Sequence, residues 1–505
     1  MAIDGVGGRT SYIGSSILNL KSQLDDLQQQ LGTGKVSNTY AGQGINRGLA
    51  VNLRAQVSSI SAFADTATNV NTRIDVANLS LQGLADIGTQ VKTAANGSPI
   101  TLGNNGQTGG QVTAQAAFAN AIELLNTQSG DRYLFSGRAT DTPATASAND
   151  ILYGSPDGTK AGLTQLIAER KDADLGADGR GRLVLSLPTP TSIQVAEDAD
   201  PSVFGLKLSA VSTTTAGATA TGPTGSPPAA TIDFGTGNPA EGDKVRFTFN
   251  LPDGSSETIE LTATSTVPPP PGSFAIGADA TATTANLQAR LDDAVKTLAG
   301  TSLVAASAIA TSNNFFDSPP QRVDLTPPAT ATTATALRDG TAADTVIWYT
   351  GEDAQGPTDS ARGTAVAQVD QAISVQYGAR ANEPAFRAML QQIAVYAAVT
   401  TSSGDPNANG QVTALSQRVA LNLSPQQGAQ TIQDIQTEFA GAQTAIKAST
   451  DRQAQIKTMT QTMLDSIEGV NQDEVVTTIL ALQTSLTASY QTTAMLYQIN
   501  LTKYL

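Results

Sequence analysis

Apolar residues near the N-terminal end recur at steps of three and four, which places them on one face of a helix. The positions are Ile17, Leu20, Leu24, Leu27 and Leu31. Gly32 and Gly34 follow and are predicted to end this helix, because glycine often terminates helices. A long second helix is predicted from 49 to about 97, and a shorter one over about 111–128.

The C-terminal part of the chain shows the same periodic pattern of apolar residues. Periodic apolar positions predict helices over 383–402, 425–468 and 473–503. The last of these carries the stripe Val475, Ile479, Leu482, Leu486 and Tyr490. Both ends of the chain are therefore expected to be helical.

Between 145 and 360 the sequence becomes rich in Pro, Gly, Thr and Ala, with short alternating runs that are typical of strands separated by turns. Segments 245–250 and 258–262 flank the pair Asp253-Gly254 and predict a β-hairpin. This part of the chain is therefore expected to be β-rich.

Other features of this middle part have simpler interpretations. A helix over about 284–299 is expected to pack against the hairpin. The Thr- and Pro-rich tracts 211–230 and 265–272 are predicted to be surface loops. Trp348, the single tryptophan, is expected to anchor a core or an interdomain contact.

These patterns predict an α+β protein. Its N- and C-terminal helices are expected to form an antiparallel coiled-coil or bundle rod, with a β-rich outer domain inserted between them. The expected segments are an N-terminal assembly helix (1–40), N-terminal rod helices (41–144), the outer insert (145–360), C-terminal rod helices (361–471) and a C-terminal assembly helix (472–505).

The last segment has an unusual charge distribution. From Asp473 to Leu505 the charged residues are Asp473, Glu474 and Lys503, whereas a solvated helix normally carries many charges. Periodicity alone fits an ordinary intramolecular coiled coil, but neutral helices at both extremes favour contacts between subunits. The predicted assembly interface is Ile17, Leu20, Leu24, Leu27, Leu31, Val475, Ile479, Leu482, Leu486, Tyr490 and Leu505.

Composition removes several classes of function. The net charge of −15 repels nucleic acid and anionic lipid. The chain has no Cys and no His, which excludes thiolate nucleophiles, imidazole bases and the usual zinc sites. The start has no basic segment followed by an apolar one, so no cleaved signal peptide is expected, and no window approaches 18 consecutive apolar residues.

We expect no catalytic, cofactor or metal site. The glycines at 42 and 44, and those at 179 and 181, lack the strand–loop–helix context of a phosphate site. The acids Asp172, Asp174 and Asp178, like the pair Asp198 and Asp200, lack the other ligands of a calcium loop. A glycosidase-type carboxylate pair has no positive support, although its members need not be close in sequence.

Four segments resemble the flagellin superfamily. Residues 24–35, which end in Thr33-Gly34-Lys35, resemble the opening helix and its exit, and 132–137 resemble the segment after the N-terminal helices. Residues 348–353 and the ending 501–505 are similar to segments of the junction proteins between hook and filament. One departure is the loop 41–48, where many relatives have a Ser-Asp-Asp-Pro-like sequence.

The resemblance implies an extracellular structural subunit of the bacterial flagellum, exported by the flagellar type III apparatus. It implies self-association, contacts with other axial proteins such as hook-associated proteins and flagellin, and allows an export chaperone. The hook-filament junction is the expected position, and a major filament flagellin is the alternative. A surface-displayed adhesin that uses the β-rich insert and a secreted hydrolase are the remaining hypotheses. No nucleic acid, membrane or small-molecule substrate is expected as a partner.

Overall fold

The computed structural model of the chain describes residues 4–97, 99–199, 201–352 and 360–501. Contacts divide the chain into two compact units. The terminal unit comprises Met1–Asn71, Ala367–Val375 and Gln443–Leu505, and the central unit comprises Thr72–Val366 and Gln376–Ala442. The protein mixes helix and sheet and has long helices at both ends, as predicted. The predicted coiled-coil rod and five-segment division stay predictions.

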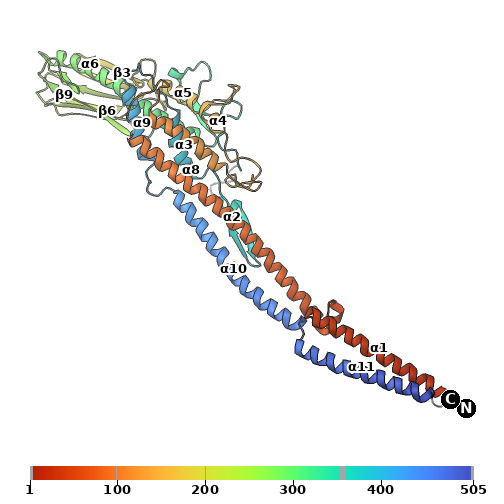
Figure 1. Ribbon diagram of the computed structural model, residues 1–505. Coiled ribbons are helices and arrows are strands. Elements are labelled where there is room, and N and C mark those ends of the chain that lie inside the picture. The colour runs from red at the N-terminus through yellow and green to blue at the C-terminus, as the bar shows by residue number, and fades with distance from the viewer. Residues whose placement is uncertain (1–3, 98, 200, 353–359, 502–505) are drawn as a thin grey trace. The chain divides into compact units, whose positions relative to one another are not determined.

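The terminal unit contains helices α1 (Asp4–Thr33) and α11 (Gln472–Leu501), which lie side by side (Figure 1). They are antiparallel, because the end of α1 is hydrogen-bonded to the start of α11: Val470 N–H donates to Gly34 O at 3.1 Å. Gly34 adopts φ +67°, a left-handed conformation that ends the helix and that glycine adopts without strain. The predicted helix end is therefore confirmed.

The terminal unit also holds parts of two longer helices, α2 (Arg47–Gly97) and α10 (Ile432–Glu468). The start of α2 packs on the end of α10 through Ala50, Leu53 and Leu464. Glu468 is buried at this junction and its carboxylate accepts from Arg54 at 2.7 Å. The strands β13 (Val366–Asp370) and β14 (Ile373–Gln376) form a two-stranded sheet, and Gln453 Nε2 of α10 donates to Val369 O at 2.7 Å.

The central unit contains two four-stranded sheets with the orders β3-β4-β7-β6 and β10-β9-β8-β5. Their strands pair antiparallel except β10, which is parallel to β9. The strand bounds are β3 (Leu183–Thr189), β4 (Ser192–Glu197), β5 (Lys207–Thr213), β6 (Thr219–Thr224), β7 (Ala229–Asp233), β8 (Lys244–Asn250), β9 (Ser256–Thr264) and β10 (Ser273–Ala275). Apolar side chains from both sheets form one buried cluster with α6 (Ala280–Leu298).

Helices and short pairings complete the central unit. Helix α3 packs on α8, and α7 packs on α5, α8 and α9. The bounds are α3 (Gly109–Leu125), α4 (Ala148–Tyr153), α5 (Leu163–Leu175), α7 (Val304–Phe315), α8 (Pro384–Ala398) and α9 (Ala408–Asn422), with short strands β1 (Gln128–Ser129), β2 (Arg132–Tyr133), β11 (Gln321–Val323) and β12 (Leu337–Asp339).

The helical stretch Ala280–Phe315 is long and apolar enough to cross a membrane by length and composition. Of its most apolar window, 61% is buried inside the protein. Its apolar residues Leu287, Leu291 and Val295 pack in the cluster shared by the two sheets. This arrangement is that of the core helix of a folded domain.

Most predicted elements are confirmed, with two corrections. The hairpin forms with Val245 opposite Leu261 and Asn250 opposite Ser256. The tract 211–230 is not a loop, because it contains β6 and parts of β5 and β7; β6 is an exposed strand without apolar alternation. Helix α10 begins at Ile432 and not near 425. Thr431 caps its start, because the Thr431 hydroxyl accepts a hydrogen bond from Asp434 N–H at 3.2 Å.

An ion pair is buried in the central unit. Arg362 donates to the Glu383 carboxylate at 2.5 Å and to Glu438 at 2.9 Å, and its guanidinium lies 4.7 Å from the centre of the Phe439 ring. Glu383 also accepts from Arg380 N–H at 3.1 Å. Both members of the pair are more than nine-tenths buried, so the loss of one leaves an uncompensated buried charge.

We therefore expect Glu383→Leu to destabilise the central unit by about 3–5 kcal/mol, and Arg362→Leu/Glu383→Leu to destabilise it less than the single change. Urea unfolding of the full chain measures the free energies. Asp293→Asn is the matched control, since Asp293 lies 4.0 Å from Arg290 in an exposed pair, where about 0–1 kcal/mol is expected. A double variant that is less stable than Glu383→Leu would contradict the expectation.

A second polar cluster surrounds Asp344. Burial acts to raise the pKa of its carboxyl, but this effect is outweighed by donors from Thr341 N–H at 2.8 Å, Arg338 Nη2 at 2.6 Å and the Thr345 hydroxyl at 2.9 Å. The pKa therefore lies well below its usual range. The ionised carboxylate stabilises the fold above the unfolded pKa of about 3.9, and this contribution is lost as the pH falls toward the folded pKa.

Asp344→Asn should consequently lower the urea midpoint at about pH 6, and the difference from the native chain should shrink at about pH 3. Equal differences at both pH values would show that the variant acts by altered packing and not by lost charge.

Candidate assembly surface

Helices α1 and α11 face each other along matched apolar stripes. The less exposed positions follow a spacing of four and three residues on both helices, which is the spacing of a seam between two paired helices. They are Ile13, Ile17, Leu20, Leu24 and Leu27 on α1, and Val475, Ile479, Leu482, Leu486 and Ser489 on α11. Val475 and Ile479 are buried in the single chain. The intramolecular pairing that periodicity allowed is thus present.

Two predicted interface residues lie beside this seam, and a third is not described. Leu31 is 36% exposed and Tyr490 is 51% exposed, so both lie beside the seam and not in it. Gln30 and Ser489, one residue earlier, are the less exposed neighbours at these points. Leu505 lies outside the described residues. The other predicted positions coincide with the intramolecular seam, and at Leu31 and Tyr490 the seam position is the preceding polar residue. Their role as an interface between subunits stays a prediction.

A second apolar surface was missed by the sequence reasoning. Exposed apolar side chains stand immediately after seam residues, a position that a search for one stripe overlooks. The examples are Leu18, Val476 and Leu480, of which Leu480 is 58% exposed; Tyr12 and Met495 are also exposed on these two helices. A shallow groove on the outer side of α11 is lined by Leu480, Gln483, Thr484, Thr487, Ala488 and Gln491.

The outer side of α11 is neutral as well as apolar. No residue from Val475 to Leu501 is charged. The hydroxyl groups donate to carbonyls one turn earlier, as in Thr484 to Leu480 O at 2.9 Å, Thr487 to Gln483 O at 2.8 Å and Thr492 to Ala488 O at 2.8 Å. The side chains therefore present mainly methyl and methylene groups outward. Covering such a surface costs little desolvation of polar groups.

Further apolar side chains are exposed at the junction of α2 and α10 in the same unit. They are Ile45, Leu49, Val51, Met459 and Met463. The loop before α2 is the segment that departs from the flagellin pattern, and its Gly44 has φ 58° and ψ −127°, a conformation suited to glycine. Tyr40 in this loop accepts from Arg54 at 2.8 Å. The loop is thus locally ordered, and the apolar side chain of Ile45 is exposed to solvent.

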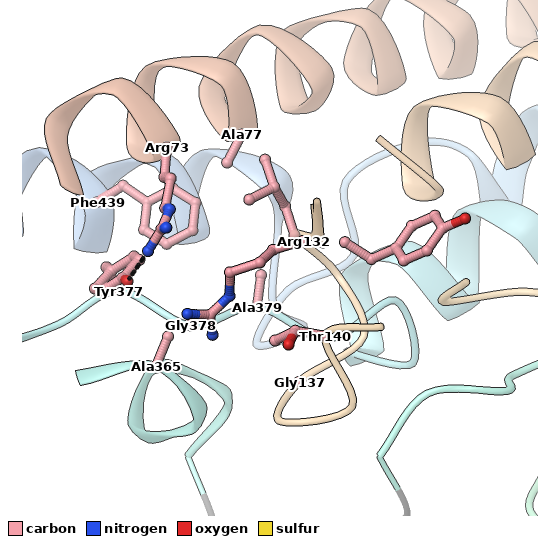
Figure 2. A pocket seen from close by; sticks show the side chains of 12 residues that line it. Arg73, Ala77, Arg132, Gly137, Thr140, Ala365, Tyr377, Gly378, Ala379 and Phe439 are labelled. Atoms are coloured by element: carbon pink, nitrogen blue, oxygen red, sulfur yellow. Dashed lines mark hydrogen bonds between the residues drawn. The ribbon is translucent and has the colours of Figure 1, made fainter. Parts of the chain in front are cut away.

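The central unit holds the resemblance segment 132–137 at a small recess (Figure 2). Gly137 N–H donates to Ala379 O at 3.1 Å, and Arg73 donates to the Tyr377 hydroxyl at 3.2 Å. The cavity there has a volume of about 30 Å³, which is room for about one water molecule. The segment therefore links chain segments within the central unit and does not form a ligand pocket.

The candidate acidic sites are occupied by protein partners. Asp174 is buried and accepts from Arg170 at 2.8 Å and from Gly205 N–H at 2.8 Å. Asp198 accepts from Arg182 at 3.0 Å, and Asp200 lies outside the described residues. Within 4–97, 99–199, 201–352 and 360–501, no group of three or more acidic side chains is arranged to hold a metal ion.

Two other sequence features have structural roles. Gly179 and Gly181 adopt φ +66° and +62° between α5 and β3, which is a turn conformation. Trp348 is buried, and its Nε1 donates to Phe316 O at 3.1 Å. The prediction of a core anchor at Trp348 is confirmed.

Comparison with models of known protein families and with curated proteins gives no match for this chain.

Proposed function

We propose that the protein is a structural subunit of the bacterial flagellum that polymerises through α1 and α11. The supporting observation is the uncharged outer side of α11, which leaves Val476, Leu480 and Met495 exposed after the seam with α1 has formed. A single chain has no further element in the described residues that covers this side. Neighbouring copies or related axial proteins supply the cover.

The flagellar assignment rests on the residue resemblance of 24–35, 132–137 and 348–353. Within that class we propose the hook-filament junction as the position, with export to the outside of the cell by the flagellar type III apparatus. The α1–α11 pair then acts as a coiled-coil assembly element, and the sheets of the central unit form the outer domain. The proposed role is structural and includes no reaction.

Deletion of the gene, followed by electron microscopy of the cells, tests this position. A junction subunit predicts hooks without filaments, together with unassembled flagellin in the medium. Deletion cells that have normally capped hooks but no flagellin subunits would identify the alternative, a major filament flagellin. Intact, functional filaments would contradict both forms of the proposal and leave the adhesin hypothesis to be tested by glycan binding.

A further inference from the structure

Strand β9 has an outer edge that is only partly paired. Along one side it pairs with β8 from Asn250↔Ser256 to Lys244↔Thr262. On the other side β10 pairs only with Thr262, Ala263 and Thr264. Within the part of the chain that the structure describes, no strand pairs with this side of 256–261.

The direction of the backbone groups follows from the neighbouring bonds. Thr262 N–H donates to Gly272 O at 3.0 Å and Thr264 O accepts from Ile276 N–H at 2.9 Å, so these residues point toward the β10 side. Ala263 N–H instead donates to Asp243 O at 2.7 Å, on the β8 side. Because the direction alternates along a strand without a register shift, Thr258 and Glu260 turn their N–H and C=O groups to the open edge.

A groove of 530 Å³ runs along this edge. Its walls are β9 on one side and α6 on the other. Its apolar lining includes Ile259, Leu261, Ala294 and Leu298, and the charged residues Glu260, Arg290 and Asp293 also line it. The volume lies within the range of about 300–1,000 Å³ that is usual for binding sites. The walls are apolar at the bottom, because Ile259 and Leu261 are buried beneath the edge. Thr258 at the rim is exposed.

We propose that this groove binds an extended peptide segment of another protein by strand addition to β9. Open backbone groups at every second residue match an extended chain, which supplies alternating donors and acceptors. Because the wall opposite β9 is the helix α6, we infer that the groove holds one added strand. This favours a single extended peptide over the sheet edge of a second copy of the chain. The alternating geometry directs an uncharged aliphatic side chain of the peptide toward Ala294 and Leu298. The groove belongs to the central unit and is independent of the polymerising helices.

The test uses the full chain and decapeptides selected from a random displayed library, with affinities measured by fluorescence anisotropy. Thr258→Pro removes the outward N–H without removing a backbone bond to β8, and proline is tolerated on an edge strand. It also removes the bond between the Thr258 and Thr248 hydroxyls, which Thr258→Val removes as well. Thr258→Val is its matched control, since it keeps the N–H and changes the side chain. Ala294→Arg obstructs the groove from α6 and leaves the ladder intact.

Selected peptides should bind the native chain and Thr258→Val with equal affinity. They should bind Thr258→Pro and Ala294→Arg about tenfold or more weakly than the native chain. Bound peptide should also slow amide exchange in 256–261. The proposal is overturned if no peptide is enriched, or if the peptides bind both obstructed variants as well as the native chain. A different result would overturn the proposal in favour of a second copy of the chain as the occupant. In that case no peptide binds, and the native chain self-associates in a way that Ala294→Arg abolishes. If Thr258→Pro fails to fold, Ala294→Arg alone decides between these outcomes.

Discussion

A chain without residues 473–505 should fail to polymerise and should still contain a folded central unit. The truncation removes nearly all of α11, and with it the partner of the α1 seam and the neutral outer surface. The central unit has its own core around Phe247, Leu287 and Leu291, none of which depends on α11. The truncation therefore removes both the seam and the outer surface from the terminal unit, and leaves the apolar core of the central unit unchanged.

Sedimentation and electron microscopy measure polymerisation, and thermal unfolding followed by circular dichroism measures the central unit. The seam and the outer surface together contain several apolar side chains worth about 1.5–3 kcal/mol each when fully buried, so the loss of assembly should be complete. Incorporation of the truncated chain into flagella at the native level would refute the assembly role of α11.

The second large effect is expected from Leu480→Asp. Leu480 lies on the outer side of α11 and is exposed in the single chain, so the aspartate is hydrated in the monomer. Once neighbouring subunits cover it, the same carboxylate becomes a buried unpaired charge, which costs several kcal/mol. The monomer should keep native helicity, whereas polymerisation should fall at least about a hundredfold.

Two comparison variants separate the surfaces. Leu421→Asp places the same charge at an exposed leucine of α9 in the central unit and should leave assembly unchanged. Leu486→Asp places it in the seam, and should loosen the α1–α11 pair of the monomer as well as block assembly. If Leu480→Asp polymerises as well as Leu421→Asp, the outer side of α11 is not an assembly surface.

Periodicity predicted the elements whose two faces differ. Helix α2 and the β8–β9 hairpin have one apolar and one polar side, and each was found near its predicted bounds, as was helix α10 except for its start. Helix α7 was missed because it is buried on nearly all sides, from Val304 to Ser312, and so has no alternation to detect. Strand β6 was missed for the opposite reason, since its side chains are exposed on both faces.

The candidate surface was predictable in part. The seam of α1 and α11 followed from spacing, and the shortage of charge in α11 indicated that more than one side is covered. The particular residues Leu18, Val476 and Leu480 could not be identified, because residues just beside a stripe are ambiguous until a structure shows which side the first partner occupies. The open edge of β9 was equally hidden, since the pairing of β10 depends on contacts distant in sequence.

The internal hydrogen bonds of the α11 hydroxyls have one more consequence. Because Thr484, Thr487 and Thr492 are satisfied within their own helix, a neighbouring subunit need not offer a donor or an acceptor at any fixed place. Contacts between methyl groups change little when one helix slides slightly along another. If the protein polymerises as proposed, adjacent copies can pack at slightly different offsets along their helices, and a polymer with such contacts can bend.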